Sequence, residues 1–351
     1  MFWATSACAA QLSLIDRRDY RVHKRWQIGG EPHGIAVSSD GVVYVGLAAT
    51  QSVAAIDPET GEVLLEAILD SPEIASTKEL VTLRIDAAGE KLIVANGSDE
   101  SVTILSLPDL AVLREITLEG DMILDAQPDP LGRYLFLLGS RAVHVFDHAG
   151  NREIRTISEV SPMAIAISSD GRLLAVAGSE DFPSGRATMV SLWDTESLRE
   201  VAREPLQTDA EIVSLLFGAE NRSLVYFAAD QLGERPMDAK KPAAMVATEG
   251  GEMRMTFSFG DIVSSELICL PGSAGPQIAA MGPSDDIIFF AEKRCGVEGT
   301  FTASARRVTT ASVYGVQAWA LEYHVPTNRI YATDPAGYLT VYRVPKIDRR
   351  R

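Results

Sequence analysis

One pattern of strands and turns repeats along this chain, and this repeat restricts the possible folds more than any other feature of the sequence. Its clearest copy has an apolar strand at residues 34–37, the turn Ser38-Ser39-Asp40-Gly41 and a second strand at 42–45. A third strand at 52–57 and a fourth at 62–68 complete the copy. Short runs rich in β-branched residues, bounded by Gly, Pro, Asp and Ser, are typical of strands joined by tight turns. The copy therefore predicts a four-stranded antiparallel meander.

Later copies keep this order of strands, with a period of roughly 40 to 55 residues. The turn after the first strand recurs at residues 86–89, 129–132, 168–171, 218–221, 272–275 and 325–328. The third strand recurs at residues 101–107, 142–147, 188–194, 243–248, 286–292 and 339–344. Together with the first copy, these positions give seven repeats.

A single meander of this kind has two apolar faces and cannot bury both by itself. Packing the copies side by side around an axis buries each sheet between its neighbours and leaves only short edges exposed. The first strand is almost continuously apolar, as at 163–167, whereas the fourth carries charges, as at 151–155. Inner and outer strands of such a ring should differ in this way. The sequence predicts an all-β fold, a β-propeller of seven four-stranded antiparallel blades; the alternative is eight blades, one of them incomplete.

The two ends of the chain predict how the ring closes. Residues 317–324, 329–333 and 339–344 read as strands one to three of the last repeat, and residues 22–28 read as its fourth strand. This pairing would join the chain ends without a covalent link. Residues 1–16 are then an extra pair of strands, either peripheral to the ring or the remnant of a longer parent chain. On this interpretation residues 1–351 form a single propeller domain.

Several segments resemble a known repeat family. Residues 32–41 (Pro-His-Gly-Ile-Ala-Val-Ser-Ser-Asp-Gly), with the strands at 43–45 and 53–57, resemble the YVTN-type β-propeller repeat. Residues 161–177 repeat this pattern closely and residues 90–104 repeat it in part. The segment Ser191-Leu192-Trp193-Asp194 also resembles the Trp-Asp ending of WD repeats. The resemblance implies a fold and specifies no chemistry.

The composition of the chain limits its possible binding partners, its membrane topology and its disulfide content. The formal net charge is −16 and the pI is near 4.8, so nucleic acid is an unfavourable partner because its phosphates would be repelled. No apolar run approaches the roughly 18 residues of a membrane helix, so no membrane span is predicted. Three cysteines are too few for a disulfide framework in a chain of 351 residues. The sequence leaves the localisation open between the cytoplasm and, after removal of a signal, the periplasm or exterior.

In a propeller, the loops that enter strand one and those that link strands two and three gather on one face, where such folds carry function. Most charged residues that the repeat places there are acidic. This predicts a negative funnel that attracts a cation, an amine or a basic protein surface. Solvated charge on a protein that is acidic everywhere is the alternative interpretation. The candidate residues are His33, Glu79, Asp99, Asp125, Asp181, Arg186, Glu211 and Asp261.

No cofactor and no metal site are predicted. The five histidines, at 23, 33, 144, 148 and 324, show no spacing typical of metal ligands, and no acidic loop of the EF-hand kind occurs. His33 is the best placed of them, at the start of an inner strand. Two gaps between strands two and three, residues 178–187 and 229–242, are unusually long. They lie on adjacent repeats and predict a pocket wall or a docking edge, or else tolerated surface loops.

Three functions are compatible with these features. The leading hypothesis is a non-catalytic propeller scaffold that binds a protein partner or a small ligand on the acidic funnel face. The first alternative is a hydrolase that resembles the propeller lactonases, for which His33, Glu79 and Arg186 would have to converge. The second is the cofactor-free propeller subunit of a periplasmic amine-oxidising dehydrogenase complex. No nucleophile elbow, glycine-rich phosphate loop or zinc signature is present in the sequence.

Overall fold

The structure is a computed structural model, which describes residues 21–69, 80–96, 101–149, 152–157, 161–183, 185–206, 320–334 and 337–343, and the strands named below between residues 212 and 312. These residues form strands and turns, with no helix among them. The described part of the chain accordingly holds no helical segment that could span a bilayer.

Five four-stranded antiparallel sheets are built within residues 21–206 and 320–343. The first consists of β2 (Pro32–Val37), β3 (Val43–Leu47), β4 (Ser52–Ile56) and β5 (Val63–Ile68). The second consists of β6 (Leu80–Ile85), β7 (Lys91–Asn96), β8 (Ser101–Ser106) and β9 (Val112–Thr117). The third consists of β10 (Ile123–Pro128), β11 (Tyr134–Gly139), β12 (Val143–Asp147) and β13 (Glu153–Ile157). The fourth consists of β14 (Ser161–Ile167), β15 (Leu173–Phe182), β16 (Gly185–Asp194) and β17 (Arg199–Pro205).

The fifth of these sheets joins the two ends of the described chain. Its order is β1 (Arg21–Gln27), β30 (Tyr338–Arg343), β29 (Arg329–Asp334) and β28 (Ala320–His324). β1 pairs antiparallel with β30, as the sequence predicted for residues 22–28. The extra strand pair predicted for residues 1–16 lies outside the described residues.

The remaining strands follow the same order. One sheet consists of β18 (Ile212–Phe217), β19 (Ser223–Ala228), β20 (Gln231–Pro236) and β21 (Met253–Thr256). Another consists of β22 (Leu267–Leu270), β23 (Gln277–Met281), β24 (Asp286–Ala291) and β27 (Arg306–Ser312). Between β24 and β27 lies a short hairpin of β25 (Arg294–Cys295) and β26 (Thr302–Ala303).

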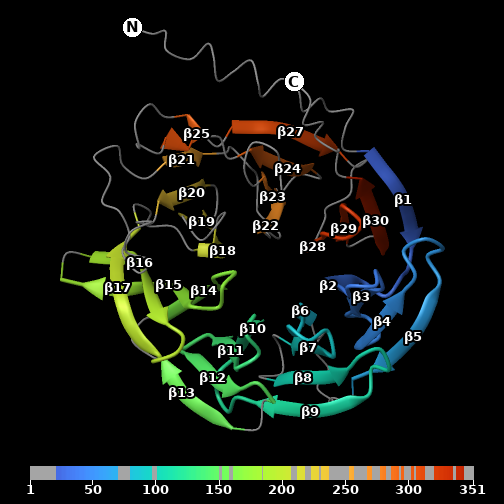
Figure 1. Cartoon of the computed structure of the whole chain (residues 1–351), viewed down its shortest axis with the longest axis horizontal. Helices are drawn as coiled ribbons and strands as arrows, with labels where there is room; N and C mark the ends of the chain where they lie inside the picture. Colours follow the sequence, from blue (N-terminus) through green and yellow to red (C-terminus); the bar gives the residue numbers. More distant parts are fainter. Residues whose placement is uncertain are drawn as a thin grey trace, which may run out of the picture.

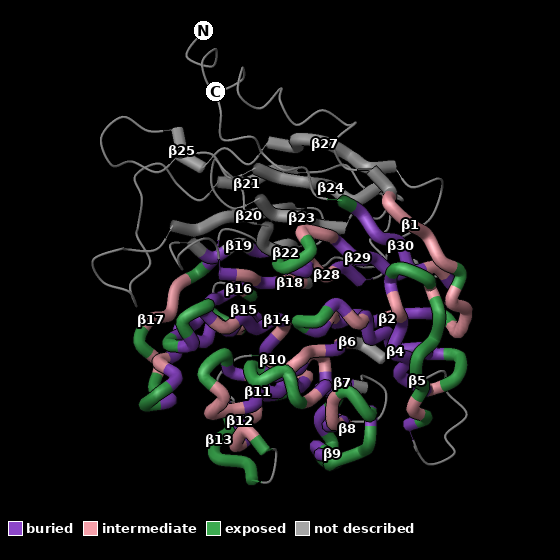
Figure 2. The backbone as a smooth tube through the Cα atoms, turned by 45° about the vertical axis from the view of Figure 1, so that its right-hand side comes forward, coloured by how far each residue is buried: buried purple, intermediate pink, exposed green. Residues whose placement is uncertain are grey.

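The sheets follow one another around a central axis, with the first strand of each sheet innermost and the fourth on the rim (Figure 1). Burial changes along the same direction, since Figure 2 shows mostly buried strands inside and exposed ones at the rim. In the first sheet, β3 and β4 are buried throughout, whereas β5 is exposed at five of its six residues. The predicted contrast between inner and outer strands is confirmed.

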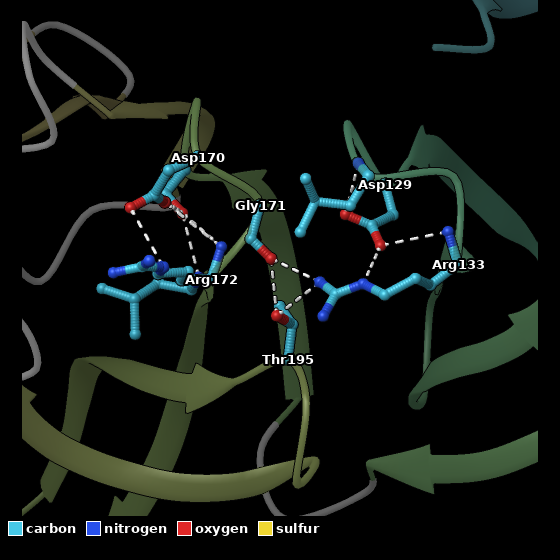
Figure 3. A network of polar contacts seen from close by, with 9 residues as sticks. Asp129, Arg133, Asp170, Gly171, Arg172 and Thr195 are labelled. Carbon is cyan, nitrogen blue, oxygen red and sulfur yellow. Dashed lines mark hydrogen bonds and ion pairs between the residues drawn. The ribbon is translucent and has the colours of Figure 1, made fainter. Parts of the chain in front are cut away.

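Apolar side chains fill the space between neighbouring sheets. Tyr44 of the first sheet and Leu83 and Leu92 of the second belong to one buried cluster. The sheets approach closely at Gly34, where a Cβ would lie 2.7 Å from Leu83 Cδ1 and 3.2 Å from the Leu83 backbone nitrogen. Between the third and fourth sheets the apolar contact is supplemented by a polar network around Arg133 (Figure 3).

The two long gaps predicted between strands two and three differ from the structure. Residues 178–187 are not a loop, because β15 and β16 run on through most of them as a paired hairpin. In the fifth repeat the third strand is β20 (Gln231–Pro236), within the predicted gap at 229–242, and not residues 243–248. A strand placed directly after β19 forms a short hairpin, so the extra length of this repeat falls between β20 and β21.

Candidate functional site

A cavity of about 490 Å³ lies between the third and fourth sheets. It opens on the face where the loops enter strand one and link strands two and three, which is the face the repeat predicted for binding. Its apolar wall consists of Met122, Leu124, Pro162, Met163 and Ala187. Its polar wall consists of Ser140, Ser161, Ser179, Arg186 and Thr188. The site therefore combines four hydroxyl groups and one guanidinium with methionine and leucine side chains.

The β15–β16 hairpin forms one side of this cavity. Both strands are ten residues long and stay in register up to the pair Phe182–Gly185. Arg186 lies directly opposite Asp181, and its guanidinium donates a hydrogen bond to the Ser179 hydroxyl. Because this register is continuous with the buried part of the sheet, Arg186 is held on a strand and not on a loop.

A second group of polar contacts holds the loops that carry Met122 and Ser140. Asp121 is buried, and its Oδ1 accepts hydrogen bonds from the Ser140 hydroxyl at 2.8 Å and the Arg141 amide at 2.9 Å. The approach is tight, since a Cβ at Gly139 would lie 2.3 Å from Asp121 Oδ2. One carboxylate thereby fixes two loops that meet at the cavity.

His144 lies between Asp121 and Glu153. Its Nε2 is 3.0 Å from Asp121 Oδ2 and its Nδ1 is 2.9 Å from Glu153 Oε1. Burial raises the pKa of Asp121, but the hydrogen bonds from His144, Ser140 and the Arg141 amide outweigh it and bring that pKa below its ordinary value. Asp121 is thus a carboxylate held in place by its neighbours and not a surface charge.

The inner strands carry a further charged pair. Arg84 Nη2 of β6 lies 3.9 Å from Asp125 Oδ1 of β10. Asp125 also accepts hydrogen bonds from the Ala126 amide and from Gln127 Nε2, each at 2.8 Å. This ion pair joins the innermost strands of the second and third sheets, next to the central axis.

His33 is half-buried at the start of β2, and burial lowers its pKa to about 4. Its imidazole is therefore neutral at pH 7. Its carbonyl oxygen accepts a hydrogen bond of 2.7 Å from the hydroxyl of Thr333, which joins the first sheet to the closing sheet.

The predicted site residues divide into two groups. His33, Asp125, Asp181 and Arg186 are described, and of these only Arg186 lines the cavity. Glu79, Asp99, Glu211 and Asp261 lie outside the described residues, so the acidic character of this face stays a prediction. In the described part of the chain, no group of three or more His, Cys, Asp or Glu residues could hold a metal ion.

Sequence reasoning missed the hydroxyl wall and the contacts of His144. The cavity serines lie at positions 140, 161 and 179 and share no common motif. The signal that was available is positional, because Ser140 and Ser161 lie at strand ends on the predicted face and Ser179 lies in the part of β15 that extends towards that face. Ser179, Arg186 and Ala187 of the predicted gap at residues 178–187 do line the cavity, but its other wall belongs to the third sheet and not to the fifth repeat, where the second predicted gap lies.

Comparison with solved structures identifies the fold. A chain in the "Crystal Structure of Mitotic Checkpoint Complex" superposes with a TM-score of 0.70 at 17% sequence identity, covering 95% of this chain and 94% of that one. The Cps50 (Swd1) β-propeller domain of Myceliophteria thermophila superposes with a TM-score of 0.69 at 13% identity, covering 93% of this chain and 99% of that domain. No family model matches the sequence, and no curated protein matches it. The protein is all-β with the fold of a β-propeller, similar to propellers of the WD-repeat kind.

Proposed function

We propose that this protein is a non-catalytic β-propeller scaffold that binds a partner protein on the face that holds the cavity. The observation that carries the proposal is the cavity between the third and fourth sheets, on the face where the loops of a propeller gather. Support also comes from the likeness to a chain whose structure was solved within the mitotic checkpoint complex.

The lining of the cavity favours one kind of anchor on the partner. Arg186 supplies a positive charge and several N–H donors, and among the described residues the Ser179 hydroxyl accepts a hydrogen bond from one of them. The Ser161 hydroxyl adds a further polar group, and Met122 and Met163 supply adaptable apolar surface. A carboxylate side chain next to an apolar residue would satisfy both walls.

A small carboxylate ligand is the second candidate occupant, because the cavity volume of about 490 Å³ lies in the range of small-molecule pockets. The two enzymatic alternatives have less support. The lactonase-like hydrolase needs Glu79 beside His33 and Arg186, and Glu79 lies outside the described residues. The amine-oxidising complex needs a partner subunit that carries the redox centre.

We also propose that the ring has seven blades and that residues 1–351 form a single domain. The five sheets of residues 21–206 and 320–343 account for five blades, and the sheets β18–β21 and β22–β27 are read as the other two. The pairing of β1 with β30 supports a ring closed by the N-terminal strand. The similarity to YVTN-type repeats is part of the same proposal.

Site-specific crosslinking tests the function. A photoreactive benzoyl-phenylalanine replaces Ala187 at the cavity or, as a control in the same sheet, Arg172 in the β14–β15 turn on the opposite face. We expect a defined protein adduct from position 187 that is absent from position 172 and is lost when Arg186→Ala is added. Identical adducts from both positions, or an adduct that persists in the Arg186→Ala background, would contradict the proposal.

A thermal-shift measurement with mono- and dicarboxylates separates the two occupants. A rise in the melting temperature that disappears in the Arg186→Ala variant would assign the cavity to a small ligand. With no rise and a specific adduct at position 187, the cavity belongs to a protein partner.

A further inference from the structure

The outer strand of the first sheet differs from the other outer strands of the ring. β5 reads Val-Leu-Leu-Glu-Ala-Ile, with a single charged residue, Glu66. The other strands in this position are β1, β9, β13, β17, β21 and β27, and each carries at least one Arg or Lys. Charge on an outer strand discourages pairing with another chain, and basic residues are the commonest device. β5 lacks this protection.

Four apolar residues of β5 are also exposed to solvent. Leu64 is 55% exposed and Ile68 is 71% exposed, and Val63 and Leu65 are exposed as well. Among the described strands, none pairs with the outer edge of β5. The strand therefore offers both apolar surface and backbone hydrogen-bonding groups to another chain.

The side chains of β5 are ordered by their pairing with β4. Leu65 and Ala67 lie opposite Ala55 and Val53, so they belong to one face of the sheet. Glu66 and Ile68 lie opposite Ala54 and Ser52, on the other face. The stretch that alternates regularly runs from Leu65 to Ile68, after the bulge beside Ile56. A strand added here would therefore find Leu65 and Ala67 on one face, and Glu66 together with Ile68 on the other.

The turn that leads into β5 is held in place by several contacts, so the N-terminal end of this strand is ordered. The turn before β5 is held by Trp26, whose indole N–H donates to the Pro58 carbonyl at 3.1 Å. The ring of Trp26 packs so closely on Gly61 that a Cβ there would lie 2.5 Å from its Cδ2. Glu59 of the same turn accepts a hydrogen bond from Lys24 at 2.6 Å. An edge that is already ordered loses little conformational entropy when a second strand pairs with it.

We propose that the outer edge of β5 binds an extended segment of a partner protein in which apolar and basic residues alternate. The segment would add to the first sheet as a fifth strand, which is a common mode of peptide recognition. Its apolar side chains would lie beside Leu65 and Ala67, because same-face neighbours on paired strands contact each other. Its basic side chains would lie beside Glu66 and near Glu62, where β5 and its preceding turn residue supply two acids and no cation. This surface is separate from the cavity between the third and fourth sheets.

Fluorescence anisotropy with a labelled peptide of alternating lysine and valine tests the proposal on the full chain. We expect the peptide to bind and a glutamate–valine peptide to bind about tenfold more weakly or worse, with affinity falling as salt rises. The double variant Leu64→Lys/Ile68→Lys should weaken binding by about tenfold or more. The matched double variant Val112→Lys/Leu113→Lys on β9, whose two residues are similarly exposed, should leave the affinity unchanged.

Hydrogen exchange and light scattering complete the test. Slower amide exchange in β5 on adding the lysine–valine peptide would place the peptide at this edge. The proposal fails if neither peptide binds, if both bind equally, or if the β9 variant loses as much affinity as the β5 variant. It also fails if the free protein is a dimer that the β5 variant dissociates, because a second copy then occupies the edge. Arg186→Ala should leave peptide binding unchanged, so failure at the edge and failure at the cavity are distinguishable.

Discussion

Arg133 Nη2, in the third sheet, donates a hydrogen bond of 2.6 Å to the carbonyl oxygen of Gly171, in the first turn of the fourth sheet (Figure 3). The same nitrogen lies 2.9 Å from the Thr195 hydroxyl, which itself donates to the Gly171 carbonyl at 2.6 Å. Arg133 Nε is held by Asp129 Oδ2 at 2.6 Å, and the Asp129 side chain is fully buried. The Arg133 guanidinium therefore joins two turns of the fourth sheet, at Gly171 and Thr195, to the buried carboxylate of Asp129 in the third sheet.

We expect Arg133→Ala to lower the free energy of unfolding by about 2 to 4 kcal/mol, because it leaves the buried carboxylate of Asp129 without its cation. Arg172→Ala is the matched control, since Arg172 is mostly exposed and lies 4.0 Å from Asp170. Its cost should stay below about 0.5 kcal/mol. Urea denaturation of both variants checks this, and equal costs for the two would contradict the role assigned to Arg133.

Gly171 should tolerate substitution less than other glycines in the same kind of turn. Its φ is +67°, and an added Cβ would lie 2.7 Å from Leu131 Cγ and 2.9 Å from Asp129 Oδ1. Gly132 has a φ of +68° with open space around it. We expect Gly132→Ala to cost about 1 kcal/mol, from the left-handed backbone alone, and Gly171→Ala to cost about 2 to 4 kcal/mol. Thermal unfolding of the two variants separates the cost of the steric clash at Gly171 from the cost of the left-handed backbone, which both share. Equal melting temperatures for the two variants would contradict the proposed clash.

The sequence predicted the turn at residues 168–171 but not the contact that Arg133 makes with it. The turn is local, and its Ser and Gly follow from the chemistry of four successive residues. The contact joins positions 38 residues apart, and it depends on how two sheets rotate against each other. The same division holds for the site. Strand ends on one face were predictable, whereas the meeting of Ser140, Ser161 and Arg186 around one cavity was not.

The conformation of residues 178–187 shows a second limit of the sequence. Its run Ser-Glu-Asp-Phe-Pro-Ser-Gly-Arg looks like a polar loop because it contains Pro, Gly and three charges. In the structure the pairing of β15 with β16 continues as far as Phe182 and Gly185, so most of this run is strand. Hairpin extension depends on backbone pairing across the turn, which residue types alone specify weakly.

The half-buried imidazole of His33 predicts a dependence of stability on pH. Burial lowers its pKa from 6.5 to about 4, so the unfolded chain binds a proton more readily than the folded one. The stability is fully present above about pH 6.5 and is lost as the pH falls towards 4, by about 2 kcal/mol with allowance for partial exposure. His33→Gln should flatten this part of the pH profile in urea titrations. A wild-type profile that keeps its slope in the variant would assign the effect to other groups.

The ion pairs around Glu59 predict a smaller effect at lower pH. Hydrogen bonds from Lys24 and then Arg329 lower the pKa of Glu59 from 4.5 to about 2. A depressed carboxylate pKa stabilises the fold above about pH 4.5, and this contribution disappears as the pH falls towards 2. The Glu59 side chain is 50% exposed, so Glu59→Gln should cost only about 0.5 kcal/mol at pH 7. Glu62→Gln, in the same turn, should cost nothing measurable, and an equal loss in both variants would argue against the ion pairs.

His144 connects the stability of the third sheet to the shape of the cavity. Its Nε2 faces the buried carboxylate of Asp121, and its Nδ1 faces the more exposed Glu153. We expect His144→Phe to cost about 1 to 3 kcal/mol, because it leaves Asp121 Oδ2 without its partner. Glu153→Gln should cost less than about 1 kcal/mol, since it changes only the exposed side. Both costs are read from chemical denaturation, and similar values for the two would contradict the asymmetry.

The same pair of variants tests whether the Asp121 contacts shape the cavity. Asp121 also accepts the hydrogen bond from Ser140, and Ser140 lines the cavity. His144→Phe should therefore weaken the crosslink formed from position 187, at a temperature where the variant is fully folded, and Glu153→Gln should leave it intact. A crosslink of full yield in His144→Phe would show that the loop at Ser140 keeps its place without the imidazole, because the two remaining bonds of Asp121 suffice to hold it.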